Sequence, residues 1–124
     1  MAMITQADKA RQFLSLHRAG EPLLLPNPWD LGSARLLASL GFEALATTSS
    51  GFAASLGRND GSVSREETLV HSAVIVAATD LPVSADLENA FADEPAAGET
   101  HLDGQPDGLR DGGRLVREGV LQVG

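Results

Sequence analysis

Three short apolar runs, each followed by polar residues, restrict the fold of this chain more than any other feature of its sequence. The runs cover residues 22–26, 43–48 and 83–86, and segments with helical periodicity separate them. These connections are too long for hairpins and have the length of crossover helices, so the runs are expected to form parallel strands. The sequence therefore predicts an α/β fold in which three parallel β-strands alternate with helices.

Three helices are expected around these strands. One over residues 6–19 precedes the first strand, a second lies between Asp30 and Gly41, and a third begins at Ser64 and Glu67, which have the spacing of a capping box. Apolar residues at helical spacing predict which faces of the second and third helices are buried. These residues are Ala34, Leu36, Leu37 and Leu40, and then Leu69, Val70, Ala73, Val74 and Ala77.

The pattern changes near residue 97. Glycine lowers helix stability by about 1 kcal/mol relative to alanine, and glycines are frequent in the segment that should hold the next crossover helix. Residues 1–97 are therefore expected to carry the strand and helix pattern, and residues 98–124 to form a glycine-rich, irregular tail. The glycines of this tail are Gly98, Gly104, Gly108, Gly112, Gly113, Gly119 and Gly124.

Composition excludes several kinds of partner and chemistry. The formal net charge of −8 creates a negative field, which disfavours nucleic acids and anionic membranes as partners. No segment has the apolar length of a membrane span or the pattern of a signal peptide, so a cytoplasmic protein is expected. The absence of cysteine excludes disulfides, thiolate metal sites and a cysteine nucleophile within the chain.

Polar clusters follow all three predicted strands, at residues 27–30, 47–51 and 84–89. Because ligands gather at the carboxyl ends of parallel strands, these clusters are expected to share one rim. Side chains two apart in a strand share a face, so Ser84 and Asp86, with Glu88 beyond them, are predicted to point into one cavity.

Oxygen ligands of this kind suit magnesium, which commonly keeps several waters. The alternative is that Asp86 and Glu88 cap the next helix or contact solvent.

The loop predicted for residues 49–63 offers further candidates. Ser50 and Gly51 present a hydroxyl and backbone amides that suit a substrate carboxylate, although a Ser-Gly turn is also ordinary loop chemistry. Residues 57–61 could form a mobile flap, or only a solvated turn. His71 is interpreted as a packing or surface residue, and Trp29 is expected to pack beneath the site.

The runs LPNPWD (25–30), GSAR (32–35), TSSGFAASLG (48–57) and PVSADLEN (82–89) resemble, in this order, the opening third of the isocitrate lyase/phosphoenolpyruvate mutase family. The resemblance covers about residues 6–97. It implies a (β/α)8 TIM barrel, of which this chain of 124 residues would be a part, since complete barrels need roughly 250 residues. It also implies magnesium-dependent cleavage or formation of C–C or P–C bonds in small 2-oxo acids and related carboxylates.

The resemblance implies roles for individual residues. Ser50, Gly51 and Phe52 fall on the family's substrate-carboxylate turn, and Asp60 falls on the catalytic acidic residue of its gating loop. Asp86 matches the second aspartate of the family's Asp-Ala-Asp metal motif. Ser84 replaces the first, and Glu88 could compensate as a third metal-site residue. The implied mechanism is polarisation of a 2-oxo group by magnesium, which stabilises the enolate formed on cleavage.

The family's remaining catalytic residues come from later strands and are not identifiable in this chain. From residue 98 onward no family pattern is recognised, so a truncated or frame-shifted gene product, inactive by itself, is expected. Full-length members of the family form homo-oligomers. Two alternatives stay open: a non-catalytic module that binds small carboxylates or metal, and an inert barrel fragment that associates with itself through an open sheet edge.

Overall fold

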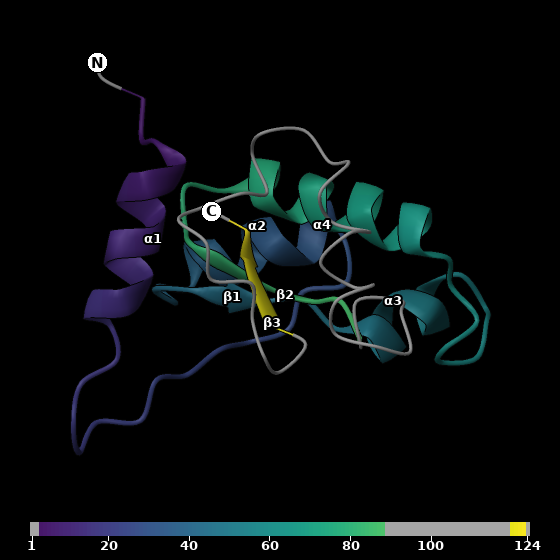
Figure 1. Ribbon diagram of the computed structural model, residues 1–124, viewed down its shortest axis with the longest axis horizontal. Helices are drawn as coiled ribbons and strands as arrows, with labels where there is room; N and C mark the ends of the chain where they lie inside the picture. The colour runs from purple at the N-terminus through teal and green to yellow at the C-terminus, as the bar shows by residue number, and fades with distance from the viewer. Residues whose placement is uncertain (1–2, 89–119, 124) are drawn as a thin grey trace, which may run out of the picture.

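The computed structural model describes residues 3–88 and 120–123. A small sheet lies between helices, with α1 at one end of the molecule and α3 at the other (Figure 1). The sheet has the order β1-β2-β3. The elements are α1 (Gln6–Ser15), α2 (Leu31–Ser39), β1 (Leu45–Ala46), α3 (Ser49–Ser55), α4 (Arg65–Ala78), β2 (Val83–Asp86) and β3 (Val120–Val123).

Local capping signals set the starts of three helices. Thr5 caps α1, Asp30 caps α2 and Ser64 caps α4, each in a reciprocal capping box with the residue three positions later. Each box satisfies two backbone N–H groups that the first helical turn leaves without partners. The box predicted from Ser64 and Glu67 is confirmed, with the Glu67 carboxylate accepting from the Ser64 amide at 2.8 Å.

The end of the first helix differs from the prediction. α1 stops at Ser15 rather than at residue 19, with Leu16 as its C-cap. Leu16 turns into a cluster with Phe13 and Ala44, and the chain then reverses in a tight turn at Gly20, whose φ is 80°. A positive φ is readily adopted only by glycine, so Gly20 serves this turn and not the end of the helix.

Lys9 fixes the first helix against the end of α4. Its Nζ donates to the Thr79 carbonyl oxygen at 3.1 Å, and the residue is only 8% exposed. Burial lowers the pKa of this ammonium group, an effect that the nearby Asp80 carboxylate opposes. Lys9 is the only lysine of the sequence. The hydrogen bond places a positive charge at the carboxyl end of α4, where the helix dipole favours it.

The first predicted strand does not form. Residues 22–26 are extended but contribute a single backbone hydrogen bond to β1, from the Ala46 amide to the Pro26 carbonyl at 3.0 Å. In a parallel ladder the amide of residue 28 would donate back to the Ala46 carbonyl, but Pro28 has no N–H, and the Asn27 side chain donates to that carbonyl instead. Leu24 is 69% exposed, whereas Leu23 and Leu25 pack against the Phe13 cluster. The run is therefore buried on one face only, and the prediction of a strand at residues 22–26 is wrong.

The other two predicted strands are present and parallel. β2 has the predicted bounds, and β1 forms only the centre of the predicted residues 43–48. Leu45 pairs with Val83 and Ala46 pairs with Ser84. The chain thus contains the crossover that the sequence predicts between these two strands.

The third strand of the sheet comes from the predicted tail. β3 pairs with β2 in antiparallel register, with Asp86 opposite Val120, so the sheet is mixed and the prediction of three parallel strands is wrong. The expectation of an irregular tail fails for these four residues. The rest of residues 98–124 lies outside the described part of the chain.

The core lies between the sheet and two helices. α2 and α4 pack on the same face of β1 and β2, through Ala34, Leu45, Ile75 and Val83, which are at most 1% exposed. The predicted inner face of α4 is wrong, since Val70 is 64% exposed. The helix instead buries Thr68, Ser72 and Ile75.

Spacing of three and four residues places these side chains on one face of α4. The Thr68 hydroxyl donates to the Ser64 carbonyl at 3.0 Å, which permits its burial. The predicted face of α2 is half right, because Ala34 and Leu37 pack inward but Leu36 and Leu40 are 60% and 66% exposed.

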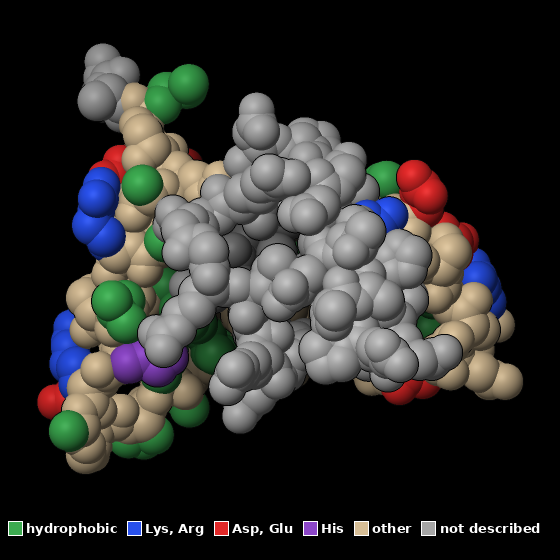
Figure 2. Space-filling view, in the orientation of Figure 1, with side chains coloured by type: hydrophobic (Ala, Val, Ile, Leu, Met, Phe, Trp, Pro, Cys, Tyr) green, Lys and Arg blue, Asp and Glu red, His purple; other side chains and the backbone are tan. Residues whose placement is uncertain are grey.

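The described surface carries charges of both signs in the view of Figure 2, where acidic and basic side chains lie close together on α1 and near the start of α4. None of the helices in the described ranges combines the length and the apolar character that crossing a bilayer requires.

Candidate functional site

The carboxyl ends of β1 and β2 meet at Thr47 and Asp86. The Thr47 amide donates to the Ser84 carbonyl at 2.8 Å, and the Asp86 amide donates to the Thr47 hydroxyl at 2.8 Å. Thr47 is buried, so this bond fixes the backbone of Asp86 from inside the molecule. The structure thus brings the second and third predicted polar clusters together at one rim, which we call the strand-end rim.

The Asp86 carboxylate is held by two backbone amides. Its Oδ2 accepts from the Ser49 amide at 3.4 Å, and its Oδ1 accepts from the Glu88 amide at 3.0 Å. Asp86 is half-buried. Each carboxylate oxygen retains accepting capacity beyond these bonds, so the group can still bind a cation or a water.

Ser84 lies on the same side of β2 as Asp86, whereas Glu88 departs from the expected alternation. Val83 packs into the core with α2 and α4, so its neighbour Ser84, only 4% exposed, faces the opposite side of the sheet. Glu88 is exposed, and its φ of 55° takes the chain out of the extended conformation. Strand alternation therefore does not place Glu88 on the face that Ser84 and Asp86 share. The prediction that all three point into one cavity loses this geometric argument for Glu88.

The first polar cluster reaches the same rim through Asn27. Its side-chain amide donates to the Ala46 carbonyl at 3.0 Å, at the end of β1. Trp29 does not pack beneath the site, because it is 50% exposed. Its carbonyl oxygen instead lies 2.7 Å from Nε2 of His71.

Residues Ser50, Gly51 and Phe52 lie in the first turn of α3, a helix that replaces part of the loop predicted for residues 49–63. Thr48 caps this helix and accepts from the Gly51 amide at 3.2 Å. This amide of the predicted substrate-carboxylate turn therefore already has a partner. Ser50 is exposed, and its hydroxyl lies 3.3 Å from that of Thr48.

Gly51 has no room for a side chain. A Cβ at this position would lie 2.6 Å from Cγ2 of Thr48, whose rotamer is fixed by its bond to the Gly51 amide. We expect Gly51→Ala to destabilise the chain by about 1–3 kcal/mol, the usual cost of overpacking, measured by urea denaturation. Thr48→Ser in the same chain removes the clashing methyl and should restore most of the loss. Equal losses with and without Thr48→Ser would contradict this explanation.

Asp60 lies in the turn that follows α3, and its hydrogen bond stays within that turn. Its carboxylate accepts from the Gly61 amide at 3.0 Å, within the same turn. Across the described ranges no hydrogen bond joins Asp60 to residues 47–50 or 84–88. The structure therefore does not bring the predicted gating-loop acid into contact with Asp86.

Arg58 ties this turn to the start of α4. Its Nη1 lies 2.7 Å from Oε1 of Glu67, and its Nη2 donates to the Ser62 carbonyl. The Arg58 guanidinium, with the Ser64 amide and hydroxyl, lowers the pKa of the Glu67 carboxyl from 4.5 to about 2.

This lowered pKa makes stability depend on pH. The ionised Glu67 stabilises the folded chain above pH 4.5, and the contribution is lost as the pH falls towards 2. Glu67→Gln should therefore flatten the loss of stability over that interval, followed by urea midpoints at several pH values. Arg58→Ala should flatten it as well, and the double variant should add little. A slope unchanged by either substitution would contradict the role of this pair.

Magnesium fits the donor set of the rim only in part. Among residues 3–88 and 120–123, no three His, Cys, Asp or Glu side chains gather as a metal cluster. In the part of the chain that the structure describes, the rim offers the carboxylate of Asp86 and the hydroxyls of Ser84 and Thr47. Magnesium commonly binds proteins through one or two carboxylates and completes its shell with water and substrate oxygens, and Asp86 has the capacity for this.

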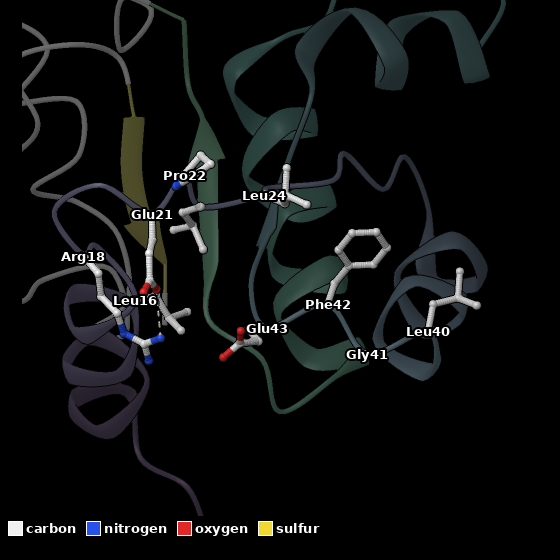
Figure 3. A pocket seen from close by; sticks show the side chains of 10 residues that line it. Leu16, Arg18, Glu21, Pro22, Leu24, Leu40, Gly41, Phe42 and Glu43 are labelled. Carbon is white, nitrogen blue, oxygen red and sulfur yellow. Dashed lines mark hydrogen bonds and ion pairs between the residues drawn. The ribbon is translucent and has the colours of Figure 1, made fainter.

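A hollow of about 330 Å³ lies at the opposite end of β1 (Figure 3). The ion pair of Arg18 and Glu21, 3.5 Å apart, lies at one side of it, and Phe42 and Leu40 lie at the other. Its residues precede β1, whereas the strand-end rim follows β1. None of the predicted site residues belongs to this hollow.

The sequence places Thr47 and Ser49 within the second predicted polar cluster, but it assigns neither of them a role in the site. Sequence reasoning missed His71 as a neighbour of the rim. His71 could have been found from its spacing, since it is three residues from Thr68 and four from Ile75, on the inner side of α4. Its partners could not have been predicted, because Trp29 lies 42 positions away in the chain.

The chain resembles known proteins in its family model, its sequence and its structure. Residues 13–102 match the family model described as phosphoenolpyruvate phosphomutase. An uncharacterized protein of Mycobacterium tuberculosis is 39% identical over 85 residues, which cover 68% of this chain and 33% of that protein. The same values hold for its counterpart in strain H37Rv.

Solved structures give a consistent result. A Burkholderia cenocepacia J2315 protein described as a lyase/mutase is 52% identical, with a TM-score of 0.74 over 78% of this chain and 35% of its own. A protein of the same organism described as a phosphonomutase is 42% identical, with a TM-score of 0.74 over 79% and 39%. A 2,3-dimethylmalate lyase of the phosphoenolpyruvate mutase/isocitrate lyase superfamily is 30% identical, with a TM-score of 0.60 over 73% and 32%. The chain spans about a third of the curated relatives it matches.

Proposed function

The chain belongs to the phosphoenolpyruvate mutase/isocitrate lyase superfamily, and from this premise we propose that it supplies part of a magnesium-dependent site. The reaction we propose is cleavage or formation of a C–C or P–C bond in a small 2-oxo acid or related carboxylate. Since the chain spans about a third of its curated relatives, the remaining catalytic groups would come from a further part of the barrel.

One observation carries this proposal. The Asp86 carboxylate stands at the carboxyl end of β2, held by the amides of Ser49 and Glu88 and directly beside the first turn of α3. A cation on Asp86 and an anionic substrate at this turn would then be neighbours. That juxtaposition is what a metal-assisted reaction of a carboxylate substrate requires.

Each residue of the rim has a proposed role. Asp86 would hold magnesium, with the Ser84 hydroxyl and water as further ligands, and the exposed Ser50 hydroxyl would donate to a substrate carboxylate. Thr47 keeps the backbone of Asp86 in place. When bound, magnesium supplies polarisation of a 2-oxo oxygen and electrostatic stabilisation of the charge that develops there. Asp60 would act from its turn as the gating-loop acid, which requires that turn to move towards the rim.

A second candidate function is a non-catalytic module that binds a small carboxylate. One observation favours it over catalysis by this chain alone. Ser84 stands where the family has a carboxylate, which leaves the rim with less negative charge for a metal ion.

Titration of the complete chain with oxalate, with and without magnesium, tests the proposal. We expect saturable binding of oxalate that requires magnesium, measured by calorimetry, and an increase in the melting temperature that saturates with it. Incubation with a panel of 2-oxo acids then separates the two candidates, because binding without turnover favours the module. If neither magnesium nor oxalate binds, both candidates are wrong.

A further inference from the structure

His71 of α4 contacts two separate segments beside the strand-end rim. Its Nε2 lies 2.7 Å from the Trp29 carbonyl oxygen, and its ring stacks on Phe52 with centroids 3.7 Å apart and planes inclined by 13°. Trp29 follows Asn27 in the first polar cluster, and Phe52 lies in the first turn of α3. One imidazole therefore connects both segments to the same rigid helix.

The carbonyl partner determines which ring nitrogen of His71 carries a hydrogen. A carbonyl oxygen can only accept, so Nε2 must carry the hydrogen of this bond. The ring is then either the neutral Nε2–H form or the imidazolium ion, and it donates to Trp29 in both. Either form can stack on Phe52, since a cation is also attracted to the face of an aromatic ring.

Within the described residues, two contacts join the first turn of α3 to its surroundings. The Ser49 amide donates to Asp86 over a long distance, 3.4 Å. The Phe52 ring stacks on His71, which links this turn to α4 through side chains.

We propose that His71 is a positioning residue for the candidate site. Its ring sets the place of Phe52, and with it the first turn of α3, while its Nε2–H holds the Trp29 segment that leads into α2. Across the described ranges no hydrogen bond joins His71 to Ser84, Asp86 or Ser50, so we infer that it acts through Phe52 and Trp29. The ligand in this inference comes from the proposed function. Its geometry comes from the stack on Phe52 and the hydrogen bond to Trp29.

Two variants separate the two contacts of His71. His71→Gln keeps a donor but loses the ring, and His71→Phe keeps the ring but loses the donor. Val70→Ala, at an exposed neighbouring position of the same helix, is the control. Each chain is assayed for the oxalate dissociation constant at saturating magnesium, and for amide hydrogen exchange of every element without ligand.

Loss of the ring should affect the site and α3 selectively. We expect His71→Gln to weaken oxalate binding roughly fivefold, the size of one lost aromatic pair, and to accelerate exchange in α3 more than in α1. His71→Phe should keep most of the protection of α3, and Val70→Ala should match the original chain.

Three results would overturn the inference. The first is a His71→Gln chain whose oxalate affinity and α3 exchange equal those of the original chain. The second is acceleration of exchange to the same extent in all elements, which would indicate a general structural role. The third is His71→Phe behaving like His71→Gln, because the ring would then not be the relevant group. If the original chain does not bind oxalate, the proposed function is wrong, and the exchange data alone decide whether His71 positions α3.

Discussion

Replacement of Ile75 with alanine is expected to destabilise the folded chain by about 2–5 kcal/mol, the usual cost of truncating a fully buried aliphatic side chain. Ile75 is 0% exposed and lies between α2 and the parallel strands, in contact with the cluster of Ala34, Leu45 and Val83. Its removal would leave a cavity in the cluster where α2 and α4 pack on the sheet. Domains of this size have only about 5–15 kcal/mol of stability, so the loss is a large part of the total.

Urea denaturation followed by circular dichroism measures this loss, and Val74→Ala is the matched control. Val74 precedes Ile75 directly but is 41% exposed, so its truncation should cost well under half as much. The helical spacing of apolar residues predicts the larger loss for Val74→Ala, because it places Val74 on the buried face of α4. A larger loss for Val74→Ala than for Ile75→Ala would show that α4 packs through the other face.

Replacement of Asp86 with alanine is expected to abolish the stabilisation of the chain by magnesium and oxalate together. Asp86 is the one carboxylate that β1, β2 and the first turn of α3 hold at the strand-end rim. A ligand present at 100 times its dissociation constant stabilises a folded protein by about 2.7 kcal/mol, and all of this would be lost. Melting temperatures with and without both ligands measure the effect.

Two further variants make the Asp86 result specific. Asp86→Ala also removes the acceptor for the Ser49 and Glu88 amides, so a lower melting temperature without ligand is expected. Asp86→Asn keeps an acceptor oxygen but not the charge, and should likewise lose the response to ligand. Glu66→Ala removes one exposed carboxylate from α4 and should keep the response. A full response in Asp86→Ala would remove the metal assignment.

Features set by neighbours in sequence were predictable. The capping box of Ser64 and Glu67 and the bounds of β2 depend on a few adjacent residues, and both predictions are confirmed. The meeting of Thr47 with Asp86 at one rim was also predictable, because it follows from parallel pairing alone.

Features decided by competing or distant interactions were not predictable. The first apolar run looked like a strand, yet Pro28 cannot donate a backbone N–H to Ala46 and Leu24 faces solvent. Residues 49–51 looked like a turn, yet the Thr48 cap and the missing side chain of Gly51 allow a helix to begin there. Which face of α4 is buried depended on which side chains fit against the sheet. The small residues Thr68 and Ser72 pack there, and larger apolar residues of the helix remain exposed.

The contact between Lys9 and Thr79 has a consequence for amine chemistry. Because the only lysine of the sequence is 8% exposed and hydrogen-bonded to the end of α4, its nitrogen is protected from acylating reagents as long as α1 stays docked in this way. The rate of Lys9 acylation then reports how often this docking is lost. The chain thus contains its own chemical reporter for the docking of its first helix, and no label needs to be added.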